Sequence, residues 1–280
     1  MNRRHFFAAA VVALLSSVAF GQAPVRQPNI LVNSYSSAHP GPRSTQPKTP
    51  VVYELRIYSI APGKTEGLLN RFRNHTLALF KKHGIESVGY WMPLDTSDTR
   101  LHFLLRYPSR EARESAWKAF MADPEWQAAA KASEANGPLL SKSPENFFLE
   151  TTDFSPAIRK GNVSQGGVFE LRTYTTPAGL LPNLDARFRD HTVALFKKHG
   201  MNNYGYWHRQ SDQPGADVTL QYLLTHKSKA AAAESFGAFG KDPEWVAAKT
   251  ASEQKAGGSL TVKDGVKSVY LVPTDFSPTK

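Results

Sequence analysis

The histidines are the side chains of this sequence best suited to acid–base or ligand chemistry near neutral pH, and there are nine of them. His102 stands out because it is in phase with Arg106 in an expected strand at 101–107, whereas the corresponding positions later in the chain hold Gln221 and Thr225. Such asymmetry suits a site that only one half of the chain uses. We therefore consider a ligand-contacting, catalytic or haem-ligating role for His102, with an ordinary exposed strand histidine as the alternative.

A Glu-x-Arg-x-Tyr pattern occurs twice, as Glu54, Arg56 and Tyr58 and again as Glu170, Arg172 and Tyr174. Each set alternates with other residues that are mostly apolar in the first copy, and this period of two predicts strands. We expect the apolar face to pack on helices and the polar face to point into an interior shared by two sheets. Buried Glu and Arg side chains are costly unless they are paired. The two sets therefore predict either structural ion pairs or polar handles in a ligand cavity beside Glu54 and Glu170.

Two adjacent aromatic residues follow a glycine in each half, as Tyr90-Trp91 and Tyr206-Trp207. Large aromatic side chains in a strand are most often core residues. The alternative is a stacking wall for a planar ligand. We include these four residues, with Arg106, in the expected ligand-binding set.

His75 and His83 recur at helical spacing with Leu68 and Phe72, so both are expected on the apolar face of a helix that Gly84 ends. Their eight-residue spacing turns them apart on that helix and no carboxylate completes a metal-binding pattern. No metal site is therefore predicted. Zero cysteine excludes disulfides, thiolate metal sites and cysteine nucleophiles. A glycine-rich phosphate loop, a nucleophile elbow and a dinucleotide-binding fingerprint are also missing from the sequence.

The sequence segments that must position these side chains occur as two copies of an internal repeat. Residues 52–91 and 168–207 are identical at 22 of 40 positions without a gap, which indicates duplication. Both copies end on Thr-Asp-Phe-Ser-Pro, at 152–156 and 274–278. The period is the size of a domain, so the chain is expected to be a tandem pair at 51–156 and 168–278, with a linker at 157–167.

Each copy predicts the order β-α-β-β-α-β. In the first copy, strands are expected at 51–58, 86–92, 101–107 and around 147–149, with a helix ending at Gly84 and others beginning after Ser109 and at Asp123. This is the ferredoxin-like α+β plan, in which helices cover one face of an antiparallel sheet. The other face needs a partner, and the second copy can supply it within the chain.

The first 50 residues are expected to lie outside these domains. Arg3-Arg4, an apolar run from Ala8 to Phe20 and small residues up to Ala23 predict an export signal at 1–23 that is similar to a twin-arginine signal. Residues 24–50 contain six prolines and predict an extended tether. The expected location is periplasmic or secreted, without a permanent membrane span. The formal charge of +10 would otherwise suggest nucleic acid, but export argues against it.

The repeated order, together with Tyr-Glu-Leu-Arg-x-Tyr, Pro-Gly, Gly-Tyr-Trp and Asp-Pro-Glu-Trp, resembles the NIPSNAP family of the dimeric α/β-barrel superfamily. The resemblance implies that two ferredoxin-like sheets face each other and close a barrel, here as a pseudo-dimer within one chain. Further self-association is a second expectation. The superfamily includes cofactor-free monooxygenases and haem proteins, whereas the family implies little about activity.

Three functional hypotheses follow. The first is a protein that binds a small, partly apolar or aromatic ligand inside the barrel. The second is an oxygen- or haem-using oxidoreductase with His102 as the first residue to test, although the sequence requires no cofactor. The third is a non-catalytic interaction module whose interior is filled.

Overall fold

The computed structural model describes residues 51–164 and 167–280. The expected export signal at 1–23 and tether at 24–50 lie outside these residues, as do residues 165–166 of the expected linker. The first half contains β1 (Val52–Ser59), α1 (Thr65–Arg71), η1 (Phe72–Thr76), α2 (Leu77–Lys82), β2 (Glu86–Pro93), β3 (Arg100–Tyr107), α3 (Arg110–Ala122), α4 (Pro124–Ser133) and β4 (Glu145–Thr151). The second half contains β5 (Val168–Thr175), α5 (Leu181–Arg187), η2 (Phe188–Thr192), α6 (Val193–Lys198), β6 (Asn202–Arg209), β7 (Thr219–His226), α7 (Lys229–Gly240), α8 (Pro243–Ala256) and β8 (Val266–Pro273).

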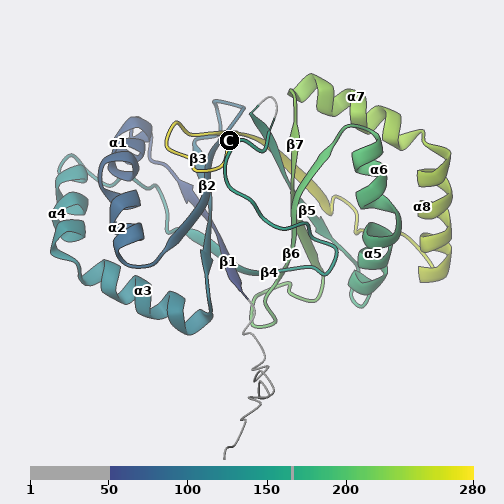
Figure 1. The fold of residues 1–280 in the computed structure, drawn as a ribbon, viewed down its shortest axis with the longest axis horizontal. Coiled ribbons are helices and arrows are strands. Elements are labelled where there is room, and N and C mark those ends of the chain that lie inside the picture. Colours follow the sequence, from purple (N-terminus) through teal and green to yellow (C-terminus); the bar gives the residue numbers. More distant parts are fainter. Residues whose placement is uncertain (1–50, 165–166) are drawn as a thin grey trace, which may run out of the picture. The chain divides into compact units, whose positions relative to one another are not determined.

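The eight strands form one closed antiparallel barrel in the order β1-β3-β2-β8-β5-β7-β6-β4. The helices of the first half cover one side of the barrel and those of the second half cover the opposite side (Figure 1). This confirms the α+β prediction of two ferredoxin-like units that close a barrel within the chain. The order repeats after four strands, so a pseudo-twofold axis runs along the barrel and equivalent residues of the two halves lie at the same end.

The last strand of each half joins the two halves. β4 pairs with β1 of its own half and with β6 of the other, for example Leu149 opposite Arg209. β8 pairs with β5 and reaches β2, where Val272 lies opposite Met92. Because both seams are built from backbone hydrogen bonds, neither half has a free sheet edge at these positions.

Three apolar clusters fill the molecule. Two lie between sheet and helices, one per half, and contain Phe72, Phe80 and Phe103 in the first half and Phe188, Phe196 and Tyr222 in the second. The third fills the barrel interior with residues of both halves, including Leu55, Trp91, Leu171, Trp207 and Leu271. The interior cluster gives the two halves a common core.

The first helix of each half contains one π-helical turn, η1 or η2, between two α-helical segments. The wider turn shifts the helical phase by about one residue. As a result His75 and its counterpart His191 are exposed, and the expectation that they pack toward the sheet is wrong. His83 is half-buried at the end of α2, where its Nε2 lies 2.6 Å from Oδ2 of Asp123, the N-cap of α4.

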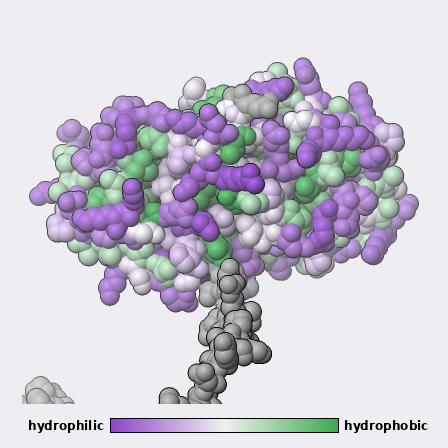
Figure 2. Space-filling model, viewed as in Figure 1, coloured by the Kyte–Doolittle hydropathy of each residue, from purple (hydrophilic) through white to green (hydrophobic). Residues whose placement is uncertain are grey.

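The surface is mainly polar. On the face shown in Figure 2, hydrophilic side chains cover most of both lateral lobes and hydrophobic ones appear in small, separate patches. The large exposed apolar residues lie on different elements, for example Met121 on α3, Val246 on α8 and Val266 on β8. Within residues 51–164 and 167–280, none of the helices has the length and apolar character needed to cross a membrane.

Candidate functional site

The strand faces are the reverse of what the sequence suggested. Tyr53 and Leu55 belong to the apolar cluster that fills the barrel interior, and Ile57 packs against it. Glu54 and Arg56 lie on the other face of β1, beneath α3. The expectation that the Glu-x-Arg-x-Tyr sets point into the shared interior is therefore wrong in both halves. Tyr58 packs edge-on against Phe103 in the helix-side cluster of its half, and the counterparts are Glu170, Arg172 and Tyr174, of which Tyr174 packs against Phe188.

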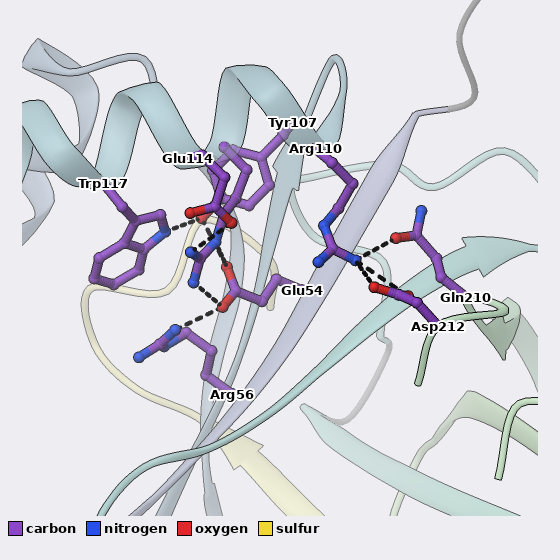
Figure 3. Close-up of polar contacts among 9 residues, drawn as sticks. Glu54, Arg56, Tyr107, Arg110, Glu114, Trp117, Gln210 and Asp212 are labelled. Atoms are coloured by element: carbon purple, nitrogen blue, oxygen red, sulfur yellow. Dashed lines mark hydrogen bonds and ion pairs between the residues drawn. The ribbon is translucent and has the colours of Figure 1, made fainter. Parts of the chain in front are cut away.

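Glu54 is the centre of a closed network between β1 and α3 (Figure 3). Its Oε1 accepts hydrogen bonds from Arg56 Nη1 at 2.6 Å and Arg113 Nη2 at 2.8 Å. Its Oε2 accepts from Arg113 Nε and from the Tyr107 hydroxyl, both at 3.1 Å. Trp117 Nε1 donates to that same hydroxyl at 2.7 Å. Glu54 is completely buried and its two oxygens accept four hydrogen bonds from neighbouring side chains, an arrangement that fits a structural ion pair.

The charges within this network explain its ionisation. Burial by itself would raise the pKa of Glu54, but the hydrogen bonds and positive charges of Arg113 and Arg56 outweigh burial and lower it. In the second half Ala232 replaces Arg113, and His226 takes the position of Tyr107. His226 Nε2 lies 3.0 Å from Glu170 Oε2, and Arg172 bonds to the other oxygen. Burial opposes ionisation there too, yet the pKa of Glu170 is lowered by His226 and Arg172.

The paired aromatic residues divide between the two faces. Tyr90 and Tyr206 face the helices, where Tyr90 stacks on Phe103 with ring centroids 5.4 Å apart. Trp91 and Trp207 face the barrel interior. Each tryptophan contacts the other half there. The ring centroids of Trp91 and Phe169 are 5.4 Å apart, and those of Trp207 and Tyr53 are 5.9 Å apart. The tryptophans therefore seal the interior between the halves.

The barrel is open at one end, where a cavity of about 850 Å³ is lined by residues of both halves. Its apolar wall includes Ile57, Phe147, Leu171 and Val269. Its polar lining includes His102, Gln221, Thr173, Arg100, Glu145, Arg209 and Lys267. The cavity was expected beside Glu54 and Glu170, but it lies instead around His102 and its counterpart Gln221.

His102 is buried in the wall of this cavity, with only 2% of its surface exposed. The alternative of an exposed strand histidine is therefore wrong. Its Nδ1 lies 3.1 Å from the carbonyl oxygen of Arg100. Burial, helped by the charge of Arg100, lowers the pKa of His102 to about 4. The ring is neutral at physiological pH, and a carbonyl can only accept, so the proton is on Nδ1 and Nε2 carries a lone pair.

Gln221 lies on the opposite wall, because β3 and β7 are four strands apart in a barrel of eight. Its Nε2 donates to Thr173 Oγ1 at 3.3 Å, and Thr173 also lines the cavity. Gln221 Oε1 is buried and has no hydrogen-bond partner among the described residues. An unpaired buried acceptor costs about 1–3 kcal/mol.

The other end of the barrel is covered. Ile158 and Val163 pack against the interior cluster, and Val163 N donates to the carbonyl of Lys280 at 2.8 Å. Arg106 lies at this covered end, where it donates to Glu86 at 3.0 Å. Arg106 is therefore separated from His102, although both belong to β3. Access to the interior is through the His102 end.

Three cations line the open end, and Arg100 is the one that pairs with a carboxylate, that of Asp98. Arg209 donates to the carbonyl of Pro214 at 2.6 Å and lies 4.3 Å from the centre of the Phe147 ring. Lys267 is exposed, and no carboxylate of the described residues lies within ion-pair distance of it. Within residues 51–164 and 167–280, no three His, Asp or Glu side chains lie together as a metal site.

Sequence reasoning selected His102 as a site residue but did not select Thr173 or Lys267. It named Gln221 only as the counterpart of His102 and not as a cavity residue. A comparison of the two halves of the sequence could have identified these cavity residues. Positions that differ between them surround the cavity, as with His102 against Gln221, whereas the buried ion pair is kept in both by exchange of partners.

Comparisons with known proteins agree with this fold. The family model described as NIPSNAP matches residues 53–156 and 169–278. Mouse "Protein NipSnap homolog 3B" is 26% identical over 229 residues, which cover 81% of this chain and 85% of the mouse protein. A NIPSNAP family protein from Agrobacterium tumefaciens is 28% identical over 38% of this chain and 97% of its own, with a TM-score of 0.34. An anthrone oxidase-like protein shares the fold with a TM-score of 0.51 and 15% identity, covering 83% of this chain and 95% of its own.

Proposed function

The chain belongs to the NIPSNAP family, and we propose that it binds a small, partly apolar molecule in the open end of its barrel. The observation that carries this proposal is the cavity of about 850 Å³ between the two halves. Ligand sites are typically concave, about 300–1,000 Å³ in volume, mostly apolar and equipped with a few polar groups that orient the ligand. Ile57, Phe147, Leu171 and Val269 supply the apolar wall, and His102 with Gln221 supplies opposed polar groups.

The experiment pairs two substitutions on β8. Val269 is half-buried in the cavity wall, whereas Val266 is exposed on the same strand and does not line the cavity. A panel of aromatic and aliphatic alcohols, acids and amines is tested by thermal shift and calorimetry on wild type, Val269→Trp and Val266→Trp. We expect some members to bind wild type and Val266→Trp, and Val269→Trp to lose them because the indole occupies the cavity. Binding that survives in Val269→Trp, or a panel without any ligand, would contradict the proposal.

A second candidate function is an oxidoreductase that uses oxygen or haem. It is favoured by His102, whose Nε2 lone pair is free to act as a base or ligand inside a partly apolar cavity. His102 Nε2 would be the protein ligand to a haem iron, and haem, when bound, would supply redox chemistry at that iron. The fold shared with an anthrone oxidase-like protein is compatible with this candidate. Haem titration and oxygen uptake test it, since a Soret band lost in His102→Ala would favour the enzyme.

Export is part of the proposal as well. It is supported by the charged start, apolar run and small residues of 1–23 in the sequence. Fractionation of a bacterial host that produces the full chain tests it. We expect a shortened protein in the exported fraction, and retention in the cytoplasm when Arg3 and Arg4 are both changed to Lys. Equal retention of both proteins would contradict export.

A further inference from the structure

Two of the polar side chains that line the cavity, His102 and Gln221, are buried in its walls. His102 donates from Nδ1 to the carbonyl of Arg100, so its remaining ring nitrogen can only accept a hydrogen bond while the ring is neutral. Arg100 is itself held at the rim, where its guanidinium pairs with Asp98. The orientation of the imidazole is thus set by the protein before any ligand arrives.

Gln221 lies in the opposite wall. Its amide nitrogen donates to Thr173, and its Oε1 is one of the buried side-chain atoms that have no partner among the described residues. The side chain is about 4% exposed, so neither water nor a ligand reaches Oε1 in this side-chain conformation. The lone pair that the cavity wall offers to a ligand is therefore that of His102 Nε2.

We propose that the ligand is an apolar ring that carries a hydroxyl group, of which a phenol is the simplest form. This inference rests on the proposed binding function and adds the polarity of the ligand. A hydroxyl proton would satisfy Nε2 of His102, and the ring would lie against Phe147, Leu171 and Val269. A site with buried acceptors discriminates strongly against an analogue without the donor, because those acceptors then stay unpaired.

The cations at the rim favour an anionic ligand as the alternative. Arg209 Nη1 donates to the Pro214 carbonyl and its guanidinium lies over the Phe147 ring, but its Nε is buried without a partner among the described residues, and Lys267 is exposed to solvent. A carboxylate that entered the cavity would place its negative charge against the lone pair of His102. It would be confined to the rim, where exposed ion pairs contribute little.

The test compares three molecules of nearly equal shape, 4-propylphenol, 4-propylanisole and 4-propylbenzoate, by calorimetry at neutral pH. The phenol is expected to bind at least about tenfold more tightly than its methyl ether, since one hydrogen bond to a buried acceptor is worth roughly that factor. His102→Phe removes the acceptor and should weaken the phenol but not the anisole. His75→Phe, at an exposed position of η1, is the matched control and should change nothing.

The outcomes separate this inference from the binding function. Equal affinity for phenol and anisole, lost in Val269→Trp, would overturn the donor requirement and leave the cavity as a binding site. Tightest binding of the benzoate would replace the phenol by an anion. If none of the three binds while other panel members do, the hydroxyl-ring class is wrong. Binding that is unaffected by Val269→Trp would overturn both proposals.

Discussion

Arg73 and Asp275 form an ion pair with two hydrogen bonds, although 202 residues separate them. Arg73 Nε donates to Oδ2 at 2.7 Å and Nη2 donates to Oδ1 at 2.9 Å. The second half repeats the arrangement, with Arg189 bonded to Asp153 at 2.7 and 2.8 Å. Each aspartate belongs to the Thr-Asp-Phe-Ser-Pro segment of the opposite half. The repeated motif, which had no assigned role in the sequence, therefore fastens each half to the first helix of the other.

The phenylalanine of this segment is expected to contribute more to the free energy of unfolding than its aspartate. Phe276 stacks on Phe72 with ring centroids 6.2 Å apart and also packs on Tyr90. Phe276→Ala should lower the free energy of unfolding by about 2 kcal/mol, since the ring is half-buried and leaves a gap. Asp275→Asn should have a small effect, because exposed ion pairs are screened by water. Urea unfolding measures both, and equal losses would show that the ion pair carries the junction.

Glu54 is expected to make stability depend on pH. Burial opposes its ionisation, but Arg113 and Arg56 lower its pKa below the ordinary 4.5. Its contribution is therefore complete above pH 4.5 and is lost as the pH falls through the lower pKa of the folded state. Glu54→Gln should cost about 3 kcal/mol at neutral pH, because it leaves two buried guanidinium groups without their charge partner.

The matched control for this prediction is Glu114→Gln. Glu114 also pairs with Arg113, but its side chain is 63% exposed. Unfolding by urea from pH 7 into acid should show a loss for Glu54→Gln that is largest at neutral pH and shrinks progressively as the pH falls below 4.5, and almost no loss for Glu114→Gln. A pH-independent cost in Glu54→Gln would mean that shape, and not charge, is what the site requires.

The sequence predicted the architecture well because duplication and strand period are both local patterns. Alternation around Glu54 correctly predicted a strand, yet it could not say which face turns inward, since a period of two is the same in either direction. Arg113 on α3, 59 positions away, pairs with Glu54 on the helix side, and in the second half His226 is the distant partner of Glu170. The tertiary partner, absent from the local pattern, determined the face.

Two local irregularities also escaped prediction. A register shift between Ser87 and Gly89 inserts one extra residue into β2 ahead of Tyr90 and Trp91, which then point to opposite faces by ordinary strand alternation. The π-helical turn at Phe72–Thr76 exposes His75, which an ideal α-helix would have buried. Both insert one extra residue into a regular period, and neither has a composition that marks it. His102 could be selected from the sequence because its replacement by Gln221 in the second copy is visible without knowledge of the bulge or the π-helical turn.

Gly89 is expected to be irreplaceable for a steric reason. A Cβ atom at this position would lie 2.2 Å from two ring carbons of Trp91, which folds back over the glycine in the barrel interior. Gly89→Ala should therefore lower the free energy of unfolding by about 3 kcal/mol, because the buried indole has no free space to move into. Gly237→Ala is the control, since nothing lies within 4 Å of its Cβ on α7. It should gain about 0.5–1 kcal/mol from helix propensity, and a loss as large as that of Gly89→Ala would refute the steric argument.

His102 is expected to reduce stability in weak acid. Its pKa is about 4 in the folded protein because of burial, against 6.5 when unfolded. Below pH 6.5 the unfolded chain binds a proton that the folded chain does not, so stability falls until the pH reaches about 4. The loss approaches about 3 kcal/mol at the lower limit. His102→Gln, which introduces the residue of the second half, should remove this part of the slope.

The measurement is the difference in unfolding free energy between His102→Gln and wild type from pH 7 to pH 4. That difference should move steadily in favour of the variant as the pH falls, whatever its value at pH 7. His75→Gln changes an exposed histidine and serves as the control for the substitution itself. If the difference for His102→Gln does not change with pH, the imidazole is not held neutral, and Nε2 of His102 is not the free acceptor on which the ligand class depends.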